Sequence, residues 1–191
     1  MVLSRAIPRA VVGAALLTGV VLLPVLASPA RADLPPRSQW VSDVQDAMQG
    51  SLAYAERRVA SGTRLAVNLD IDNTSLATQY DRGQAVARVL RFARYADSQV
   101  VSVLFNTGRL RGDGRMVWAA SVLEREGFTV TAICGRARAS EGLSHSKQRC
   151  RARFVRHGYT IIANIGNRRT DFTGGDYERA FRLPNYDNQL G

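Results

Sequence analysis

The chain has 191 residues and a formal net charge of +10, from 26 basic side chains against 16 acidic ones. This length predicts one domain. A composition of 46% hydrophobic and 22% charged residues excludes a collagen, a low-complexity disordered protein and a disulfide-dense mini-scaffold. Of the 26 basic residues 25 are Arg, so the one lysine, Lys147, stands out as a candidate functional residue.

The first 32 residues have the pattern of a secretory signal peptide. Arg5 and Arg9 precede an apolar run over residues 10–26, and the small-x-small sequence at 30–32 follows it. An uncleaved anchor is the alternative, but this run contains Pro24 and is short for a hydrocarbon core about 30 Å thick. We therefore expect cleavage after Ala32, a secreted (extracellular) protein and no stable membrane association after cleavage.

The mature chain begins with a Pro-containing linker over residues 33–38, followed by a predicted helix over 42–60. Apolar runs predict strands over 64–69 and 100–105, and apolar residues at helical spacing predict a helix over 84–96 between them. The remaining elements are predicted in the order helix, strand, helix, strand and strand, over residues 113–126, 128–134, 146–157, 159–165 and 179–183.

This alternation predicts an α/β fold with a mostly parallel sheet, covered by helices on both faces in three Rossmann-like layers. We expect a signal peptide over residues 1–32, a linker and N-terminal helix over 33–63, and a core domain over 64–191. Ligands of such sheets bind at the carboxyl ends of the strands, so the residues after each strand form the candidate site.

The first two strands are each followed by a polar motif. The sequence DIDNT at residues 70–74 places Asp70 and Asp72 after a buried strand, where carboxylates are unfavourable unless paired, hydrogen-bonded or metal-bound. A plain turn, in which the side chains serve the local backbone, is the alternative. The sequence NTGR at residues 106–109 offers a hydroxyl, a glycine that lets backbone N–H groups approach an anion, and a guanidinium.

Two later signals follow in the chain. Lys147 is predicted at the start of helix 146–157, where the helix dipole disfavours a cation unless an anion lies in front of it. The sequence GNRRTD at residues 166–171 places the amide of Asn167 and the carboxylate of Asp171 after the fourth strand. Solvated surface positions are the alternative for these residues.

In this order the four signals resemble the motifs of the haloacid dehalogenase-like (HAD) superfamily of phosphohydrolases. Residues 70–74 are similar to its first motif, Thr107 to the second, Lys147 to the third and residues 166–171 to the fourth. The tail over residues 177–185 resembles the end of the secreted acid phosphatase branch. The resemblance, which spans about residues 64–171, implies an HAD-type core and a phosphoric monoester hydrolase.

The resemblance also implies a role for each motif. Asp70 is the implied nucleophile, which forms an aspartyl-phosphate, and Asp72 is the implied general acid and base. Lys147 is the implied catalytic cation. The implied phosphate-binding residues are Thr107, Gly108 and Arg109.

The implied cofactor is Mg²⁺, which prefers oxygen ligands. The implied ligands are the Asp70 carboxylate, the Asp72 backbone carbonyl, and the side chains of Asn167 and Asp171. Asn167 departs from the family pattern, because the fourth motif generally has Asp at this position. An amide oxygen brings no negative charge, so weaker metal affinity is expected unless Asp171 compensates.

Little chain is available for a lid over the site. Residues 75–83 alone separate the first motif from the next helix, and residues 135–145 have the pattern of a loop. We therefore expect an open site, or one covered partly by helix 42–60 or by a second subunit of a homo-oligomer. Such a site suits small-molecule phosphomonoesters, and nucleic acid is not an expected partner.

Other features leave alternatives open. Cys134 and Cys150 predict either a disulfide or two small buried side chains, and with His145 and His157 they fit no common zinc spacing. Eight Arg between residues 135 and 170 favour either steering of anionic substrates or a solvated basic face. Two other functions are open: a catalytically weak phosphate-binding or storage-like relative, and a basic secreted protein that binds nucleic acid or other polyanions.

Overall fold

The computed structural model describes residues 33–112 and 114–191, so the predicted signal peptide lies outside the described residues. The helices are α1 (Arg37–Ala47), α2 (Ser51–Arg58), α3 (Ala87–Ser98), α4 (Arg115–Arg125) and α5 (Leu143–Arg156). The strands are β1 (Leu65–Leu69), β2 (Ser102–Leu110), β3 (Ala132–Arg136), β4 (Thr160–Gly166) and β5 (Arg179–Arg182), with a 3₁₀ helix (Arg169–Asp171) after β4. No helix within the described residues is both long enough and apolar enough to cross a membrane.

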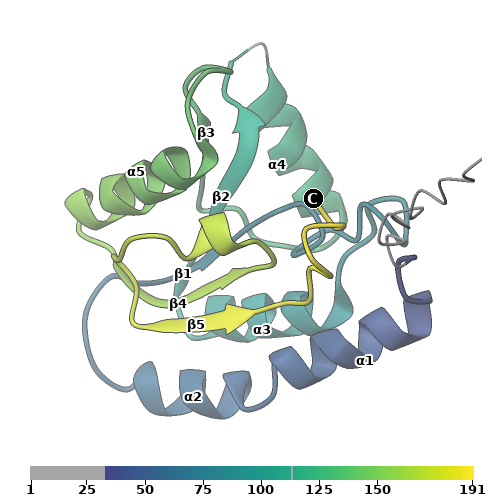
Figure 1. The fold of residues 1–191 in the computed structure, drawn as a ribbon. Helices are drawn as coiled ribbons and strands as arrows, with labels where there is room; N and C mark the ends of the chain where they lie inside the picture. Colours follow the sequence, from purple (N-terminus) through teal and green to yellow (C-terminus); the bar gives the residue numbers. More distant parts are fainter. Residues whose placement is uncertain (1–32, 113) are drawn as a thin grey trace, which may run out of the picture. The chain divides into compact units, whose positions relative to one another are not determined.

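The five strands form one parallel sheet in the order β3-β2-β1-β4-β5, with β1 at its centre (Figure 1). Every residue of β1 is buried, as expected of a strand with helices on both faces. Leu69 at the end of β1 pairs with Phe105 of β2 and with Ile165 of β4. The residues that follow these three positions therefore meet at one edge of the sheet, at the point where the strand order reverses.

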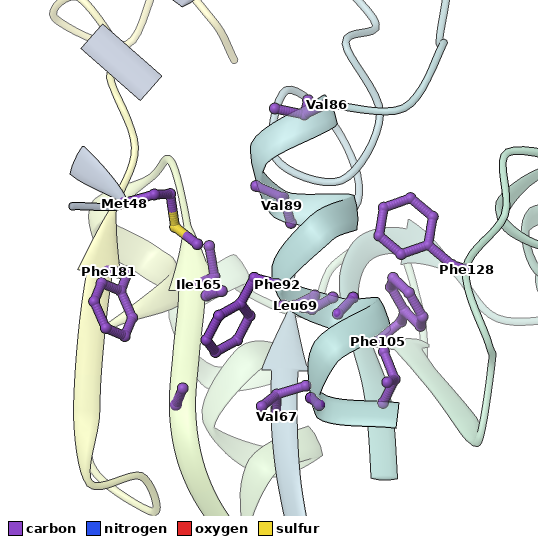
Figure 2. Packing of buried hydrophobic residues seen from close by; sticks show 14 of the residues in the cluster. Met48, Val67, Leu69, Val86, Val89, Phe92, Phe105, Phe128, Ile165 and Phe181 are labelled. Atoms are coloured by element: carbon purple, nitrogen blue, oxygen red, sulfur yellow. The ribbon is translucent and has the colours of Figure 1, made fainter. Parts of the chain in front are cut away.

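Two hydrophobic clusters cover the two faces of the sheet. The larger cluster packs α1 to α4 against the sheet and includes Met48, Phe92, Phe105 and Phe181 (Figure 2). The smaller cluster packs α5 on the other face, through Cys150 and Phe154 among others. The predicted α/β fold, with helices on both faces of a parallel sheet, is confirmed.

The predicted helix over residues 42–60 is two helices, so that prediction is wrong. Gly50 separates α1 from α2 and has a φ of 71°, a left-handed conformation that interrupts a helix and that glycine adopts without strain. Helix α1 also begins at Arg37, inside the predicted linker. Trp40 and Ala55 anchor the two helices in the larger cluster. Neither helix contributes a residue to the pocket described below, so this pair does not cover it.

Two element boundaries near the site also differ from the prediction. Strand β2 continues to Leu110 instead of ending at residue 105, so residues 107–109 extend the strand rather than form a loop. Its pairing with β3 is irregular between Asn106 and Leu110, which frees this stretch from regular sheet geometry. Helix α5 begins at Leu143, so Lys147 lies in its second turn and not at its start.

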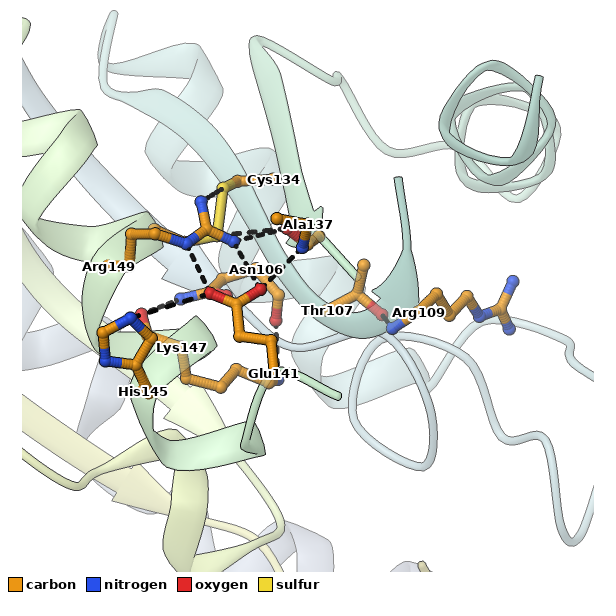
Figure 3. Close-up of a disulfide and its surroundings, with 11 residues drawn as sticks. Asn106, Thr107, Arg109, Cys134, Ala137, Glu141, His145, Lys147 and Arg149 are labelled. Atoms are coloured by element: carbon orange, nitrogen blue, oxygen red, sulfur yellow. Dashed lines mark hydrogen bonds and ion pairs between the residues drawn. A yellow bond between two sulfur atoms is a disulfide. The ribbon is translucent and has the colours of Figure 1, made fainter. Parts of the chain in front are cut away.

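Cys134 of β3 and Cys150 of α5 form a disulfide, with their Cα atoms 5.7 Å apart (Figure 3). Of the two alternatives for these residues the disulfide is therefore the correct one, and a zinc site on the two sulfurs is excluded. The bond joins strand β3 to the helix that carries Lys147.

Candidate active site

A pocket of about 310 Å³ opens at the carboxyl ends of the central strands. Its lining comes from the turn after β1, the end of β2, the end of β3, the first turns of α5 and the turn after β4. The lining residues are Asp70, Asp72, Gly108, Arg109, Arg136, Leu143, Lys147, Arg168 and Thr170. The pocket therefore brings together residues from all four sequence motifs.

Asp70, Lys147 and Asp171 form a buried group that we call the lysine cluster. The Lys147 Nζ atom makes a short hydrogen bond to Asp70 Oδ1 and lies 2.6 Å from Asp171 Oδ1. The three residues are 6%, 3% and 2% exposed, respectively. A buried cation between two carboxylates is strongly favoured once formed, because removal of any one partner leaves an uncompensated buried charge.

Burial and neighbouring charges shift the proton affinities of this cluster. Burial raises the pKa of Asp70 to about 6; Lys147 opposes this shift, and the charge of Asp171 adds to it. Burial alone would lower the pKa of Lys147, but the two carboxylates more than offset that effect and raise it above its ordinary value. Lys147 is therefore a cation at neutral pH, whereas Asp70 gives up its proton less readily than an exposed carboxyl.

Three buried asparagines hold the lysine cluster from inside the sheet, and none of them was predicted as a site residue. Asn106 of β2 donates its Nδ2 to the Lys147 carbonyl (2.8 Å) and accepts from Lys147 Nζ through its own backbone carbonyl (2.6 Å). Asn68 donates to Asn164 (2.5 Å), which in turn donates to the Asp171 carbonyl (2.8 Å). The available signal was a lone Asn at an inward position of each apolar strand, because a buried amide requires partners.

Asp72 and Arg109 form a second, more exposed ion pair that we call the rim pair. Arg109 Nη2 lies 2.6 Å from Asp72 Oδ1, and Arg109 Nε donates to Asp72 Oδ2 at 3.0 Å. The same guanidinium lies 5.3 Å from the ring centre of Trp118 on α4. The hydrogen bond to Asp72 raises the pKa of Arg109, so Arg109 is a cation at neutral pH.

The second motif is built into the end of β2. Thr107 is completely buried, and its Oγ1 accepts a hydrogen bond from the Arg109 backbone N–H at 3.2 Å. A Cβ added to Gly108 would come within 3.0 Å of the Leu143 side chain, so a larger residue would press on the start of α5. Gly108 and Arg109 line the pocket and Thr107 does not. Figure 3 shows Thr107 and Arg109 at this strand end, with the Arg109 side chain extending away from Lys147.

Asn167, the first polar residue of the fourth motif, is 5% exposed and has an asymmetric set of partners. Its Nδ2 donates to the carbonyl oxygen of Leu190 at 3.2 Å and lies 3.5 Å from Asn185 Oδ1. Its Oδ1 is buried and has no hydrogen-bond partner among the described residues. Asn167 does not line the pocket. An unpartnered buried amide oxygen is unusual, and a bound cation or hydrogen-bond donor would remove the cost of burying it.

The oxygen donors at this edge fit a hard divalent cation. The carboxylates of Asp70 and Asp171 and the free Oδ1 of Asn167 are the kinds of ligand that Mg²⁺ takes. No group of three His, Cys, Asp or Glu side chains within the described part of the chain is arranged to hold a metal.

The eight Arg between residues 135 and 170 have divided roles. Arg136 and Arg168 line the pocket, as expected of side chains that steer an anion. Arg151, by contrast, is 0% exposed and donates to the backbone carbonyls of Asp171 (2.6 Å) and Gly175 (2.9 Å). It therefore supports the turn after β4 from within the protein.

A family model for HAD superfamily subfamily IIIB (acid phosphatase) matches residues 77–189. The match covers Thr107, Lys147 and the fourth motif, and it begins after the Asp70–Thr74 segment. No curated protein matches the chain. Phosphatases of this superfamily generally use a divalent metal, usually Mg²⁺, and act on small phosphoesters. The chain therefore belongs to the acid phosphatase subfamily IIIB of the HAD superfamily and is a phosphomonoester hydrolase.

Proposed function

We propose that the protein is an exported, Mg²⁺-dependent acid phosphatase that hydrolyses small phosphomonoesters through an aspartyl-phosphate on Asp70. The observation that carries this proposal is the lysine cluster at the carboxyl edge of the sheet. Its Asp70 lies two residues before Asp72 in the chain. A carboxylate held against a fixed cation, with a second carboxylate nearby, suits attack on a phosphate ester followed by hydrolysis of the product.

Substrate binding uses the positive side chains of the pocket. The phosphoryl group would lie against Lys147 and the Gly108–Arg109 end of β2, which supply a point charge, backbone N–H groups and a guanidinium. Thr107 would support this strand end from beneath, because its hydroxyl accepts a hydrogen bond from the Arg109 backbone N–H. The substrate competes with Asp72 for Arg109, so binding would release Asp72 from the rim pair.

The chemistry then proceeds in two displacements. Once substrate has released it from Arg109, Asp72 takes up a proton from solvent. An Asp70 carboxylate oxygen then attacks phosphorus while the bond to the leaving oxygen breaks, and Asp72 gives that proton to the leaving oxygen. Asp72, now a carboxylate, takes a proton from water, and this water attacks the phosphorus of the aspartyl-phosphate. Inorganic phosphate leaves, and Asp70 and Asp72 return to their starting forms.

The metal would be held by Asp70, Asn167, Asp171 and the Asp72 backbone carbonyl. When bound, Mg²⁺ supplies positive charge that offsets the repulsion between the carboxylates and the phosphate. The free Oδ1 of Asn167 supports this assignment, because a buried acceptor without a donor is suited to a cation.

Export is proposed from the N-terminal sequence, with signal cleavage after Ala32. The disulfide between Cys134 and Cys150 supports it, because such bonds persist in oxidising compartments outside the cytosol. N-terminal sequencing of protein collected from the culture medium would give Asp33 as the first residue. Retention of Met1 in cell-associated protein would contradict the proposal.

Turnover of p-nitrophenyl phosphate tests the enzymatic part. We expect hydrolysis that EDTA abolishes and Mg²⁺ restores, and hydroxylamine trapping of the acyl phosphate at residue 70. Asp97→Asn, an exposed carboxylate on α3, is the matched control and should behave as the wild type. Turnover that EDTA leaves unchanged would overturn the metal assignment, and full activity of Asp70→Asn would overturn the mechanism.

A further inference from the structure

The chain segment after β5, residues 183–190, returns from the sheet edge to the fourth motif. Figure 1 shows this yellow segment turning from the end of β5 back across the molecule toward the marked C-terminus. Leu183 continues the pairing of β5, since its N–H donates to the Gly166 carbonyl at 2.8 Å. Leu190 is 1% exposed and belongs to the larger hydrophobic cluster. The segment is therefore packed into the fold at both of its ends.

The Leu190 carbonyl oxygen accepts hydrogen bonds from two motifs at once. Asn73, in the first motif, donates its Nδ2 at 2.8 Å, and Asn167, in the fourth, donates its Nδ2 at 3.2 Å. The orientation of the Asn73 amide is fixed, because its Oδ1 already accepts from the Gln79 backbone N–H at 2.9 Å. One carbonyl thus joins the turns that follow β1 and β4.

The same carbonyl also fixes the orientation of Asn167. Both atoms that its Nδ2 faces, the Leu190 carbonyl and Asn185 Oδ1, are acceptors, so the amide cannot turn its own oxygen toward them without repulsion. The orientation leaves Oδ1 on the opposite side, buried and without a partner. An aspartate at position 167 would place a carboxylate oxygen against the Leu190 carbonyl, with no N–H to bridge them.

We infer that residues 185–190 are a positioning segment of the active site, in which the Leu190 carbonyl orients Asn167 Oδ1 toward the metal. The inference rests on the proposed function and explains why this chain has Asn where the fourth motif generally has Asp. With Asn in place of Asp at position 167, the chain has one negative charge fewer at the metal. In its place the Asn167 amide donates to the Leu190 carbonyl, which also accepts from Asn73.

The first experiment measures Mg²⁺ affinity by calorimetry in the wild type and in two variants, a truncation and Leu190→Ala. A stop codon after Asn188 removes the Leu190 carbonyl, whereas Leu190→Ala keeps the carbonyl and removes only the buried side chain. We expect the truncation to weaken Mg²⁺ binding about tenfold, which corresponds to the loss of one hydrogen bond that orients the ligand. Leu190→Ala should lower the melting temperature but keep the Mg²⁺ dissociation constant within about threefold of the wild type.

Two results would overturn the inference. Unchanged Mg²⁺ affinity in the truncated chain would show that the segment does not orient a ligand. Equal weakening in Leu190→Ala would assign the effect to packing and not to the carbonyl. Absence of Mg²⁺ binding in the wild type would instead overturn the metal part of the proposed function, and the next experiment would then decide the inference without metal.

The second experiment uses Asn167→Asp in metal-free protein, with and without the last three residues. In the full chain we expect the melting temperature to fall by about 4 °C, because the new carboxylate faces the Leu190 carbonyl. In the truncated chain the same substitution should leave the melting temperature unchanged. An equal fall in both backgrounds, or none in either, would contradict the inference.

A third measurement does not depend on truncation. In ¹⁵N-labelled full-length protein the Asn167 side-chain NH₂ signals, assigned by their loss in Asn167→Asp, should exchange slowly with solvent. Exchange as fast as that of an exposed amide such as Gln49 would contradict the contact with Leu190.

Discussion

Asp70 and Lys147 of the lysine cluster line the same pocket as the rim pair, but the two groups are held in opposite ways. Lys147, Asp70 and Asp171 are buried, and three asparagines fix them from inside the sheet. The Arg109 and Asp72 side chains keep 26% and 40% of their surface exposed, and Trp118 is the further contact of Arg109. The difference separates a rigid part of the site, which aligns the attacking oxygen, from an exchangeable part, whose ion pair can open for substrate.

Asp70→Asn tests the rigid part and should have the largest effect. An amide is not a nucleophile toward phosphorus, so kcat should fall about 10⁴-fold or more while the fold is kept. Steady-state kinetics on p-nitrophenyl phosphate, with circular dichroism as the check on folding, would measure it. Residual activity above one per cent would mean that the attacking oxygen comes from elsewhere.

Lys147→Met should be the most destabilising substitution in the site. It leaves two buried carboxylates without a cation, and loss of one partner from a buried ion pair costs about 3–5 kcal/mol. Because the pKa of Asp70 is already about 6, protonation should recover part of this loss at pH 5. Urea unfolding of Lys147→Met and the wild type at pH 7.5 and pH 5 would measure this loss. Equal stability of the two proteins at pH 7.5 would contradict the distinction between the lysine cluster and the rim pair.

Lys147→Arg is the companion test, because it keeps the charge but replaces a compact ammonium with a wide planar fork. We expect stability between those of the wild type and Lys147→Met, and turnover lowered about 100-fold because the nucleophile is displaced. Near-normal turnover would show that the lysine is not required as a point charge.

Arg109→Gln tests the exchangeable part. An exposed ion pair contributes at most about 1 kcal/mol to stability, so the unfolding free energy should change little. KM for the phosphate ester should instead rise about tenfold, with a smaller change in kcat, because the guanidinium is proposed to bind substrate. A loss of stability as large as that of Lys147→Met would mean that the rim pair is as rigid as the lysine cluster.

Glu141→Gln should have the smallest effect and a defined pH dependence. Hydrogen bonding to Arg149 lowers the pKa of Glu141 to about 2, with help from the Ala137 N–H (Figure 3). Its contribution to stability is therefore complete above the ordinary carboxyl pKa and is lost as the pH falls toward 2. Melting temperatures of the wild type and Glu141→Gln should differ above about pH 4.5 and converge near pH 2. A constant difference at all pH values would assign the effect to packing.

The convergence of the site could be predicted from the sequence because it follows from topology. Asp70 follows β1, Arg109 lies at the end of β2 and Asp171 follows β4, and the parallel strands of one sheet end at a common edge. The strands themselves were readable as apolar runs, and the alternation of strands with helices predicted the layers.

What could not be predicted depends on tertiary contacts. Gly50 separates α1 from α2 through its positive φ, which the sequence does not reveal because helices tolerate glycine elsewhere. Residues 107–109 lie beyond the predicted strand, yet β2 runs through them to Leu110, which pairs with β3. Helix α5 begins before Ser146, and Leu143 in its first turn lies against Gly108. The link between Leu190 and Asn167 joins residues with no sequence pattern in common.

The strand order has a consequence for how the enzyme acquires its activity. Every pairing in the sheet is parallel, so no two neighbouring strands are joined by a hairpin, and Leu65 must find Thr160 across most of the chain. Folding rates fall as such distant contacts dominate, so refolding should be slow for a protein of this size. Since the lysine cluster needs both β1 and the turn after β4, turnover should return only as the β4 amides become protected from exchange. Catalytic competence is then a late event of folding, and no fragment that lacks β4 should possess it.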